Sequence, residues 1–388
     1  MIPRQLASKA QALAQKFPIV TITGPRQSGK STLVKTIFRD KPYVSLEEPD
    51  IQLLAQTDPR SFLSNYPNGA VFDEVQRVPI LFSYIQSIVD QANQSGMFIF
   101  SGSQNFLLME SITQSLAGRV AILKLLPFSL AEIGLIHQNI PSTDELLWKG
   151  GYPRLYDKII APADFYPNYV QTYLERDVKT LRDIGELTTF TRFLKLCAGR
   201  IGTVLNYSSL ASDCAVSVNT IKAWISVLEA SYVLYLLPPY YRNFNKRLVK
   251  SPKMYFYDTG LVCSLLNIQS PQQLNTHYLR GNLFENWAVT EVLKHYYNQG
   301  LTPPCYYWQD QSGKEVDLLI ETPTHLKAIE VKAGMSFSSE YFKNLSYLEK
   351  TMAEGEALQK YVLYTGKQPF QTSLGKYITM DSLSQELQ

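Results

Sequence analysis

The sequence has 388 residues, of which 45% are apolar and 18% charged, and its formal net charge is +3. This composition is typical of a folded globular protein and excludes a disordered or low-complexity chain, while the length predicts two or three domains. A net charge this small does not by itself indicate a nucleic-acid partner, and no apolar run approaches the ~20 residues that a membrane span requires.

The N-terminal segment, residues 1–6, lacks the apolar core of a secretory signal. The cysteines are widely spread and show neither zinc-ligand nor disulfide spacing; they are Cys197, Cys214, Cys263 and Cys305. We therefore expect a cytoplasmic protein with reduced, structural cysteines and no membrane partner.

A glycine-rich loop follows the first apolar run and is the most informative motif of the chain. Residues 18–23 predict a buried strand and residues 31–38 a helix, and the loop between them fits the pattern G-x-x-x-x-G-K-[ST]. Backbone N–H groups of such a loop and the positive end of the helix cradle the phosphates of ATP. We expect Lys30 to neutralise phosphate charge and the Ser31 hydroxyl to hold Mg²⁺; the alternative is an ordinary glycine turn. The loop residues are Gly24, Pro25, Arg26, Gln27, Ser28, Gly29, Lys30 and Ser31.

An acidic pair follows a short apolar strand at residues 70–72. We expect Asp73 to hold Mg²⁺ and Glu74 to orient and polarise the attacking water, because phosphoryl transfer depends on positioning and electrostatics. The alternative is a solvated Asp-Glu pair at a strand end.

Two further polar residues are candidates for the catalytic site. Ser103 follows the strand at residues 97–100 and is interpreted either as a sensor that bonds the γ-phosphate or lytic water, or as part of a turn. Arg119 precedes the strand at residues 120–125, where it is either a finger or sensor that stabilises transition-state charge, or a surface arginine.

Five apolar strands alternate with helical segments along this first part of the chain, at residues 18–23, 43–46, 70–72, 97–100 and 120–125. Such alternation predicts an α/β fold, a parallel sheet with helices on both faces. Nucleotide then binds at the carboxyl ends of the strands.

The middle of the chain predicts a helical connector and then a winged helix-turn-helix. Arg176 lies in a charged helical segment and either reaches the nucleotide from a lid or lies on a solvated helix face. Helices at 207–211 and 218–229 precede strands at 232–237 and 253–257, and a basic loop joins the two strands. Contacts to nucleic acid are expected from Lys222, Arg242, Lys246, Arg247 and Lys250. A protein contact is the alternative.

The last part of the chain contains a loose nuclease-like pattern. Asp317 precedes Glu330 by 13 positions, and Lys332 faces the same side of its strand as Glu330. Asp317 and Glu330 could hold a divalent ion, with Glu285 as a further ligand and Lys332 placing the water. The alternative is a salt-bridged hairpin.

The whole layout resembles the prokaryotic AAA-type (AAA+) P-loop ATPases joined to a C-terminal domain of unknown function with a nuclease-like end. The residues that carry this resemblance are 24–32, which extend the phosphate loop to Thr32, and 72–76, 101–103, 116–119, 127–132, 150–153, 175–177, 257–261 and 281–285. Glu285, Asp317, Glu330 and Lys332 look like the core of the PD-(D/E)xK nuclease superfamily. The resemblance implies an ATPase domain at residues 1–140, a helical connector or lid at 141–195, a winged helix at 196–265 and a restriction-endonuclease-like α/β domain at 266–388.

The leading hypothesis is a Mg²⁺-dependent ATPase whose nucleotide state controls the winged helix and the nuclease-like domain, acting on DNA. AAA-type sites often form between subunits, so a homo-oligomer is compatible with this hypothesis. The alternatives are a nucleotide-dependent switch with a non-cleaving scaffold, and an ATPase that recruits a protein partner.

Overall fold

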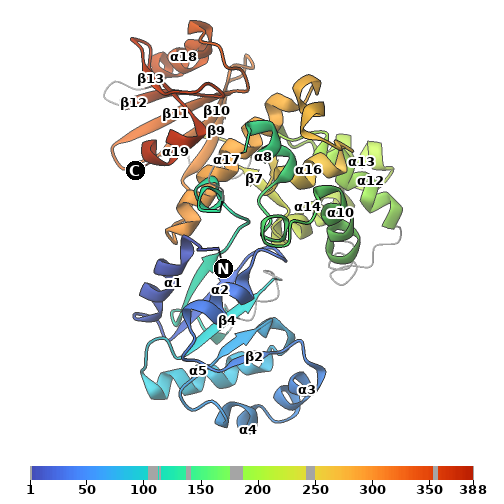
Figure 1. The fold of residues 1–388 in the computed structure, drawn as a ribbon, viewed down its shortest axis with the longest axis vertical. Coiled ribbons are helices and arrows are strands. Elements are labelled where there is room, and N and C mark those ends of the chain that lie inside the picture. The colour runs from blue at the N-terminus through green and yellow to red at the C-terminus, as the bar shows by residue number, and fades with distance from the viewer. Residues whose placement is uncertain are drawn as a thin grey trace. The chain divides into compact units, whose positions relative to one another are not determined.

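The computed structural model describes residues 2–103, 112, 115–136, 141–174, 187–241, 250–352 and 357–387. The chain divides into two compact units (Figure 1). The first comprises Met1–Phe128, Ala230–Tyr232 and Tyr296–Leu301, and the second comprises Ser129–Glu229, Val233–His295 and Thr302–Gln388. Within the described ranges, no helix combines the length and the hydropathy needed to cross a membrane.

The first unit is built on a five-stranded parallel sheet with the order β2-β3-β4-β1-β5. Its strands are β1 (Ile19–Thr23), β2 (Tyr43–Ser45), β3 (Val71–Asp73), β4 (Phe98–Gly102) and β5 (Val120–Lys124). Every residue of β1, β3 and β4 is buried, as expected for strands covered on both faces. The prediction of a parallel α/β sheet is confirmed.

Helices cover both faces of this sheet. The helical elements are α1 (Leu6–Ala14), α2 (Lys30–Ile37), α3 (Pro49–Thr57), α4 (Pro59–Ser64), the 3₁₀ turn η1 (Val75–Arg77) and α5 (Ile80–Ala92). One core packs α5 against a cluster of phenylalanines from β3 and β4. The other packs α1 and α2 against Val20, Ile22 and Ile99. Both faces of the sheet are therefore buried under helices.

The second unit begins with short helices around a three-stranded antiparallel sheet of order β6-β8-β7. The strands are β6 (Thr203–Val204), β7 (Leu234–Leu237) and β8 (Lys253–Phe256). The helical elements are α7 (Leu130–Gly134), α8 (Thr143–Lys149), α9 (Arg154–Asp157), α10 (Pro162–Tyr169), the π-helix η2 (Val170–Leu174), α12 (Leu187–Ala198), α13 (Tyr207–Cys214), α14 (Val218–Ala230), α16 (Thr259–Leu265) and η3 (Pro271–Thr276).

The helices and strands that a winged helix requires are thus present, and the identification itself stays a prediction. The first strand begins at Leu234 rather than at residue 232, because Tyr232 has a left-handed backbone with φ 56° that separates it from α14. The basic loop at residues 242–249 lies outside the described residues.

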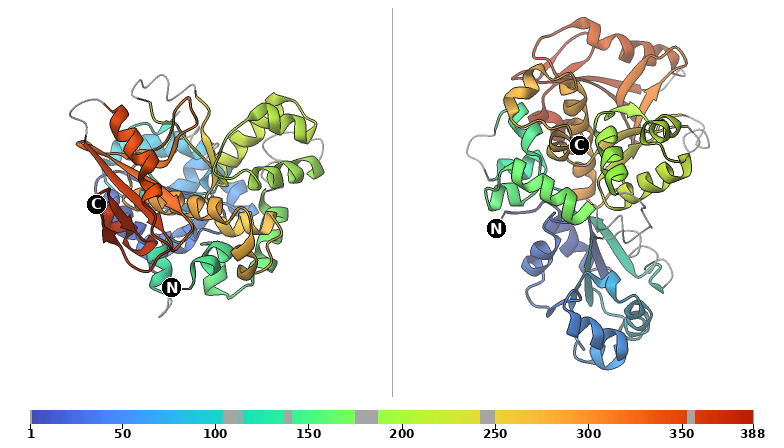
Figure 2. Two further views of the ribbon diagram at one scale, coloured as in Figure 1. Left: turned by 90° about the horizontal axis from the view of Figure 1, so that it is seen from above. Right: turned by 90° about the vertical axis from the view of Figure 1, so that its right-hand side faces the viewer.

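A six-stranded mixed sheet of order β13-β14-β12-β11-β10-β9 forms the end of the chain (Figure 2). The strands are β9 (Cys305–Gln309), β10 (Glu315–Glu321), β11 (His325–Lys332), β12 (Ala357–Tyr364), β13 (Phe370–Gln371) and β14 (Lys376–Ile378), and the helical elements are α17 (Arg280–Asn298), η4 (Ser339–Phe342), α18 (Lys343–Thr351) and α19 (Met380–Glu386). The pairs β9-β10 and β10-β11 are antiparallel, whereas β11-β12 and β12-β14 are parallel. Val316, Leu345 and Val362 belong to the core that joins α18 to this sheet.

Asp258 joins two of the sequence motifs within the second unit. Its carboxylate accepts hydrogen bonds from the Tyr166 hydroxyl at 2.6 Å, the Gly151 N–H at 2.7 Å and the Leu261 N–H at 3.0 Å, the last as N-cap of α16. A Cβ on Gly260 would lie 2.2 Å from the Tyr166 hydroxyl, so a side chain there is excluded. These contacts give the motif at residues 257–261 a structural explanation.

Candidate nucleotide site and carboxylate cluster

The phosphate loop joins β1 to α2 and has the backbone that its glycines permit. Gly24 has φ +146°, and a Cβ there would lie 2.1 Å from the Leu125 carbonyl oxygen. Gly29 has φ 92° and stands at the N-cap of α2. Arg4 donates to the carbonyls of Ser28 at 2.7 Å and Leu126 at 2.6 Å, which fixes the far side of the loop. Side chains larger than hydrogen would therefore distort the loop at both glycines.

Two polar groups of the loop suit an anion. Lys30 is buried, and its ammonium donates to the carbonyl oxygens of Gly24 at 2.9 Å and Pro25 at 2.7 Å. The Ser28 hydroxyl is also buried and has no hydrogen-bond partner within the described part of the chain. A buried ammonium beside an unpaired hydroxyl at a helix N-terminus fits the phosphates of a nucleotide.

Asp73 is held at the end of β3 by three hydroxyl groups. Its Oδ2 accepts from Ser31 at 2.7 Å and from Tyr43, and its Oδ1 accepts from Ser101 at 2.5 Å. Burial, followed by the hydrogen bond to Asp73, raises the pKa of Tyr43, which therefore stays a neutral donor. A carboxylate and a serine hydroxyl at this distance are oxygen ligands of the kind that Mg²⁺ prefers. Sequence reasoning identified Ser31 and Asp73 and missed Tyr43 and Ser101.

Glu74 follows Asp73 with an uncommon backbone. Its φ and ψ are 54° and 43°, in the left-handed region that a residue with a side chain rarely adopts. Its Oε2 accepts from the Ser103 hydroxyl at 3.2 Å, and the Gln76 amide also donates to it. Gln76 Oε1 is buried and has no partner among the described residues. A strained backbone of this kind persists where the surrounding contacts stabilise it. In this conformation the Glu74 side chain contacts Ser103.

Arg119 lies at the amino end of β5, whereas the phosphate loop follows the carboxyl end of β1. Because β1 and β5 are parallel, these two positions are at opposite edges of the sheet. Its guanidinium forms a two-pronged ion pair with Asp90, at 2.5 and 2.9 Å. This geometry does not suit a sensor for nucleotide in the same chain. The finger interpretation, in which Arg119 reaches a neighbouring subunit, stays a prediction. Arg176 lies outside the described residues.

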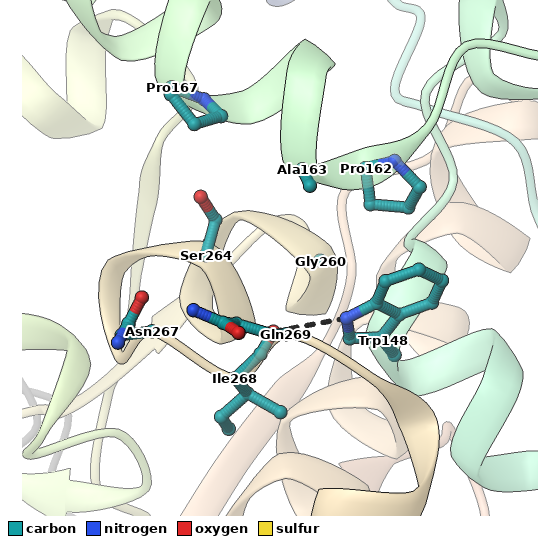
Figure 3. A pocket seen from close by; sticks show the side chains of 9 residues that line it. All are labelled: Trp148, Pro162, Ala163, Pro167, Gly260, Ser264, Asn267, Ile268 and Gln269. Carbon is teal, nitrogen blue, oxygen red and sulfur yellow. Dashed lines mark hydrogen bonds between the residues drawn. The ribbon is translucent and has the colours of Figure 1, made fainter.

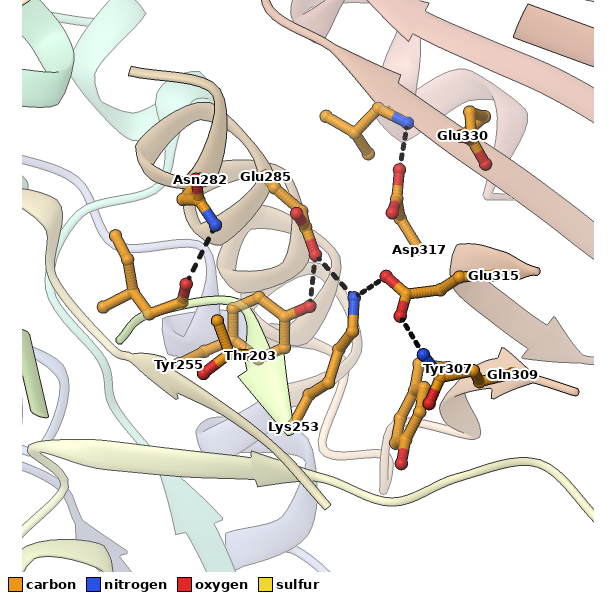
Figure 4. Close-up of polar contacts among 12 residues, drawn as sticks. Thr203, Lys253, Tyr255, Asn282, Glu285, Tyr307, Gln309, Glu315, Asp317 and Glu330 are labelled. Carbon is orange, nitrogen blue, oxygen red and sulfur yellow. Dashed lines mark hydrogen bonds and ion pairs between the residues drawn. The ribbon is translucent and has the colours of Figure 1, made fainter. Parts of the chain in front are cut away.

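The four nuclease-like candidates lie on α17, β10 and β11 of the second unit, and Figure 4 shows Glu285, Asp317 and Glu330. Lys332 Nζ lies 2.7 Å from Glu330 Oε1, and Asp317 Oδ2 accepts the Val331 N–H at 2.8 Å. Glu330 Oε2 is buried and has no partner within the described ranges. We call these residues, with Lys253 and Glu315, the carboxylate cluster.

Lys253 and Glu315 are the members of the cluster that the sequence did not indicate, and Lys253 is the more deeply buried of the two. Its ammonium lies 3.2 Å from Glu285 Oε1 and forms a second ion pair with Glu315, and its side chain is 2% exposed. Tyr255, two residues along β8, donates to the same oxygen of Glu285 at 2.5 Å. The sequence pattern that could have connected Lys253 to Tyr255 is the strand period of two, which places both residues on one face of β8.

Burial dominates the electrostatics of the cluster. Burial, followed by repulsion from Asp317, raises the pKa of Glu285 to about 7 and that of Glu330 to about 8. Burial alone would lower the pKa of Lys253, but attraction to Glu285, Asp317 and Glu315 outweighs it and raises that pKa. Over the described part of the chain, no group of three or more His, Cys, Asp or Glu side chains is arranged to hold a metal ion.

The remaining basic candidates are only partly described. Lys222 is exposed on α14, with its ammonium 5.8 Å from the centre of the Tyr207 ring, and Lys250 is exposed before β8. Arg242, Lys246 and Arg247 lie outside the described residues. The nucleic-acid surface stays a prediction.

A pocket of about 410 Å³ opens between α8, α10 and α16 of the second unit (Figure 3). Trp148 lines it and donates its indole N–H to the Ile268 carbonyl at 3.0 Å. The other lining residues are Pro162, Ala163, Pro167, Gly260, Ser264, Asn267, Ile268 and Gln269. None of the predicted site residues lines this pocket.

Three family models match successive parts of the chain. Residues 16–134 match the AAA domain, residues 140–272 match a domain of unknown function (DUF8612), and residues 280–383 match another domain of unknown function (DUF4143). The first match agrees with the phosphate loop, Asp73 and the parallel sheet. The first part of the chain therefore resembles an AAA-type ATPase domain, whereas the other two matches assign no function.

Similar proteins and structures were also found. The uncharacterized protein Rv2008c of Mycobacterium tuberculosis and the uncharacterized protein Mb2031c of Mycobacterium bovis are each 28% identical over 333 residues, which cover 85% of this chain and 73% of theirs. The Walker-type ATPase PABY2304 of Pyrococcus abyssi has a TM-score of 0.47 and 13% identity over 68% of this chain and 96% of its own. AMPPCP-bound DnaA from Aquifex aeolicus has a TM-score of 0.30 and 12% identity over 58% and 85%.

Proposed function

We propose that this protein binds and hydrolyses ATP with Mg²⁺, and that its nucleotide state controls the winged-helix and nuclease-like parts of the second unit in an action on DNA. The observation that carries the ATPase proposal is the hydrogen bond of 2.7 Å between Ser31 and Asp73, which brings the end of the phosphate loop to the end of β3. Glu74 and Ser103 lie at the same carboxyl end of the strands and contact each other.

Each residue at this end of the sheet would have its own role in ATP hydrolysis. The phosphate-loop N–H groups and Lys30 would bind the phosphates, and Lys30 would exchange two loop carbonyls for phosphate oxygens. Ser31 and Asp73 would hold Mg²⁺, which neutralises charge on the phosphates when bound. Glu74, fixed by Ser103 and Gln76, would orient the attacking water.

Lys30→Ala tests the binding step. We expect ATP affinity to fall about 10- to 100-fold, because a charge-assisted hydrogen bond contributes roughly 1.5–3 kcal/mol. Titration with a fluorescent ATP analogue measures the change, and Lys16→Ala, at an exposed lysine of the same unit, is the matched control. Equal affinity of the Lys30 variant and the wild type would contradict the phosphate-binding role.

Nicking of supercoiled plasmid with Mg²⁺ or Mn²⁺, with and without ATP, tests the action on DNA. Glu330, Asp317 and Lys332 support this proposal, since the unpaired Glu330 oxygen lies beside the ion pair at 2.7 Å. We expect Lys332→Ala to abolish nicking, with Lys350→Ala on α18 as the control. ATP dependence of the wild-type reaction would show the coupling.

The second candidate function is a nucleotide-dependent switch whose nuclease-like domain is a non-cleaving scaffold that binds a protein partner. The ion pairs of Lys253 with Glu285 and Glu315 favour it, because they neutralise carboxylates that a metal would need. Intact ATP hydrolysis without nicking under any metal condition would favour the switch over the nuclease.

A further inference from the structure

Lys253 stands in the carboxylate cluster as a fixed positive charge. Its backbone lies in β8, the central strand of its sheet, paired with Val204 of β6 and with Leu237 of β7. Its ammonium reaches Glu285 on α17 and Glu315 on β10, so three elements meet at one nitrogen (Figure 4). The strand pairing on both sides keeps the side chain directed at these carboxylates.

Glu285 has little freedom to turn elsewhere. Lys253 and Tyr255 both donate hydrogen bonds to its Oε1. A divalent ion that bound Oε1 of Glu285 would have to displace the ammonium from that oxygen. Because the Lys253 side chain is only 2% exposed, its ammonium would then lose a partner in a buried site, which costs free energy.

Asp317 and Glu330 have other partners. Asp317 accepts the Val331 N–H, and Glu330 is paired with Lys332, so that the three carboxylates do not converge on one point. The cluster therefore has the residue types of an oxygen-ligand metal site without its arrangement. Glu330 Oε2 is buried and has no hydrogen-bond partner among the residues that the structure describes.

We propose that Lys253 is the resident cation of the carboxylate cluster, and that its ammonium excludes a divalent ion from Glu285 unless Lys253 is displaced. This proposal rests on the proposed nuclease-like function, because it concerns which cation those carboxylates take. It makes Lys253 a positioning residue that determines cation affinity, and it ties the three-stranded sheet to the cluster within the second unit.

Mn²⁺ titration of the nucleotide-free, full-length protein, with free Mn²⁺ followed by electron paramagnetic resonance, tests the proposal. Lys253→Met keeps a side chain of similar length and removes the charge. We expect it to raise Mn²⁺ affinity at the cluster about tenfold or more. Lys253→Arg keeps a cation and should bind Mn²⁺ like the wild type. The double variant Lys253→Met with Asp317→Asn should lose the gain, which assigns it to the cluster rather than to the nucleotide site.

Lys253→Gln decides the matter if Lys253→Met does not fold. It removes the charge but keeps a polar group beside Glu285 and Glu315, and it should raise Mn²⁺ affinity several-fold. Unchanged Mn²⁺ affinity in the folded variants would overturn the proposal. Plasmid nicking distinguishes this proposal from the nuclease function. Tighter Mn²⁺ binding by Lys253→Met without nicking supports the proposal and contradicts the nuclease function. Nicking by a wild type that binds Mn²⁺ as tightly as Lys253→Met supports the nuclease function and contradicts the proposal.

Discussion

Replacing Glu74 by glutamine is expected to slow ATP hydrolysis by roughly 10²- to 10⁴-fold, the range that a positioned general base contributes. Glutamine has nearly the same size as glutamate but carries no negative charge, so it cannot polarise the attacking water. The phosphate loop is untouched, and the affinity for ATP should stay within about twofold. Phosphate release under single-turnover conditions, together with a nucleotide titration, measures both effects.

The environment of Glu74 makes this variant informative. The backbone at this residue is left-handed, and the side chain is fixed by Ser103 and Gln76. Glutamine can retain the contact with the Ser103 hydroxyl, so a loss of rate reports the missing charge rather than a collapsed site. Glu48→Gln, at an exposed glutamate before α3, is the matched control. Hydrolysis at the wild-type rate in Glu74→Gln would remove the assignment of Glu74 as the base.

Sequence reasoning reached the centre of the nucleotide site because its residues follow strand ends. The parallel register places Asp73 opposite Ser101, and β1 leads directly into the phosphate loop. Each strand end could be found from a short apolar run and the polar residue after it. Tyr43 could not, since it begins its strand and its side chain reaches Asp73 across a strand pair that the sequence does not specify.

The carboxylate cluster shows more clearly which contacts residue spacing in the sequence cannot predict. Asp317 and Glu330 lie on antiparallel neighbours and could be paired from the sequence, whereas Lys253 comes from a different sheet, 32 positions before Glu285. A lysine at the start of an apolar strand gives no sign of whether it is solvated or buried. Here burial against three carboxylates decides its role, and that arrangement exists only after α17, β8 and β10 have packed.

Asp258→Ala is expected to lower the free energy of unfolding of the second unit by about 3–5 kcal/mol. The variant removes the acceptor of the N–H groups of Gly151 and Leu261, which stay buried, whereas the Tyr166 hydroxyl can still donate to the Lys149 carbonyl. Each of these two unsatisfied buried donors costs about 1–3 kcal/mol, and the loss at Leu261 is the lost N-cap of α16. Burial raises the pKa of the Asp258 carboxyl, so the cost of burying its charge offsets part of the stability that its hydrogen bonds contribute.

Tryptophan fluorescence during urea unfolding isolates this effect, because all four tryptophans lie in the second unit, at positions 148, 224, 287 and 308. Asp164→Ala, at an exposed aspartate in the first turn of α10, should shift stability by less than about 1 kcal/mol and serves as the control. Asp258→Asn should fall between the two, since one oxygen can still accept from Tyr166. If Asp258→Ala unfolds with the wild-type midpoint but loses ATP-dependent function, Asp258 acts in the mechanism rather than in the fold. The motif at residues 257–261 would then need a functional explanation in place of the structural one given by its contacts.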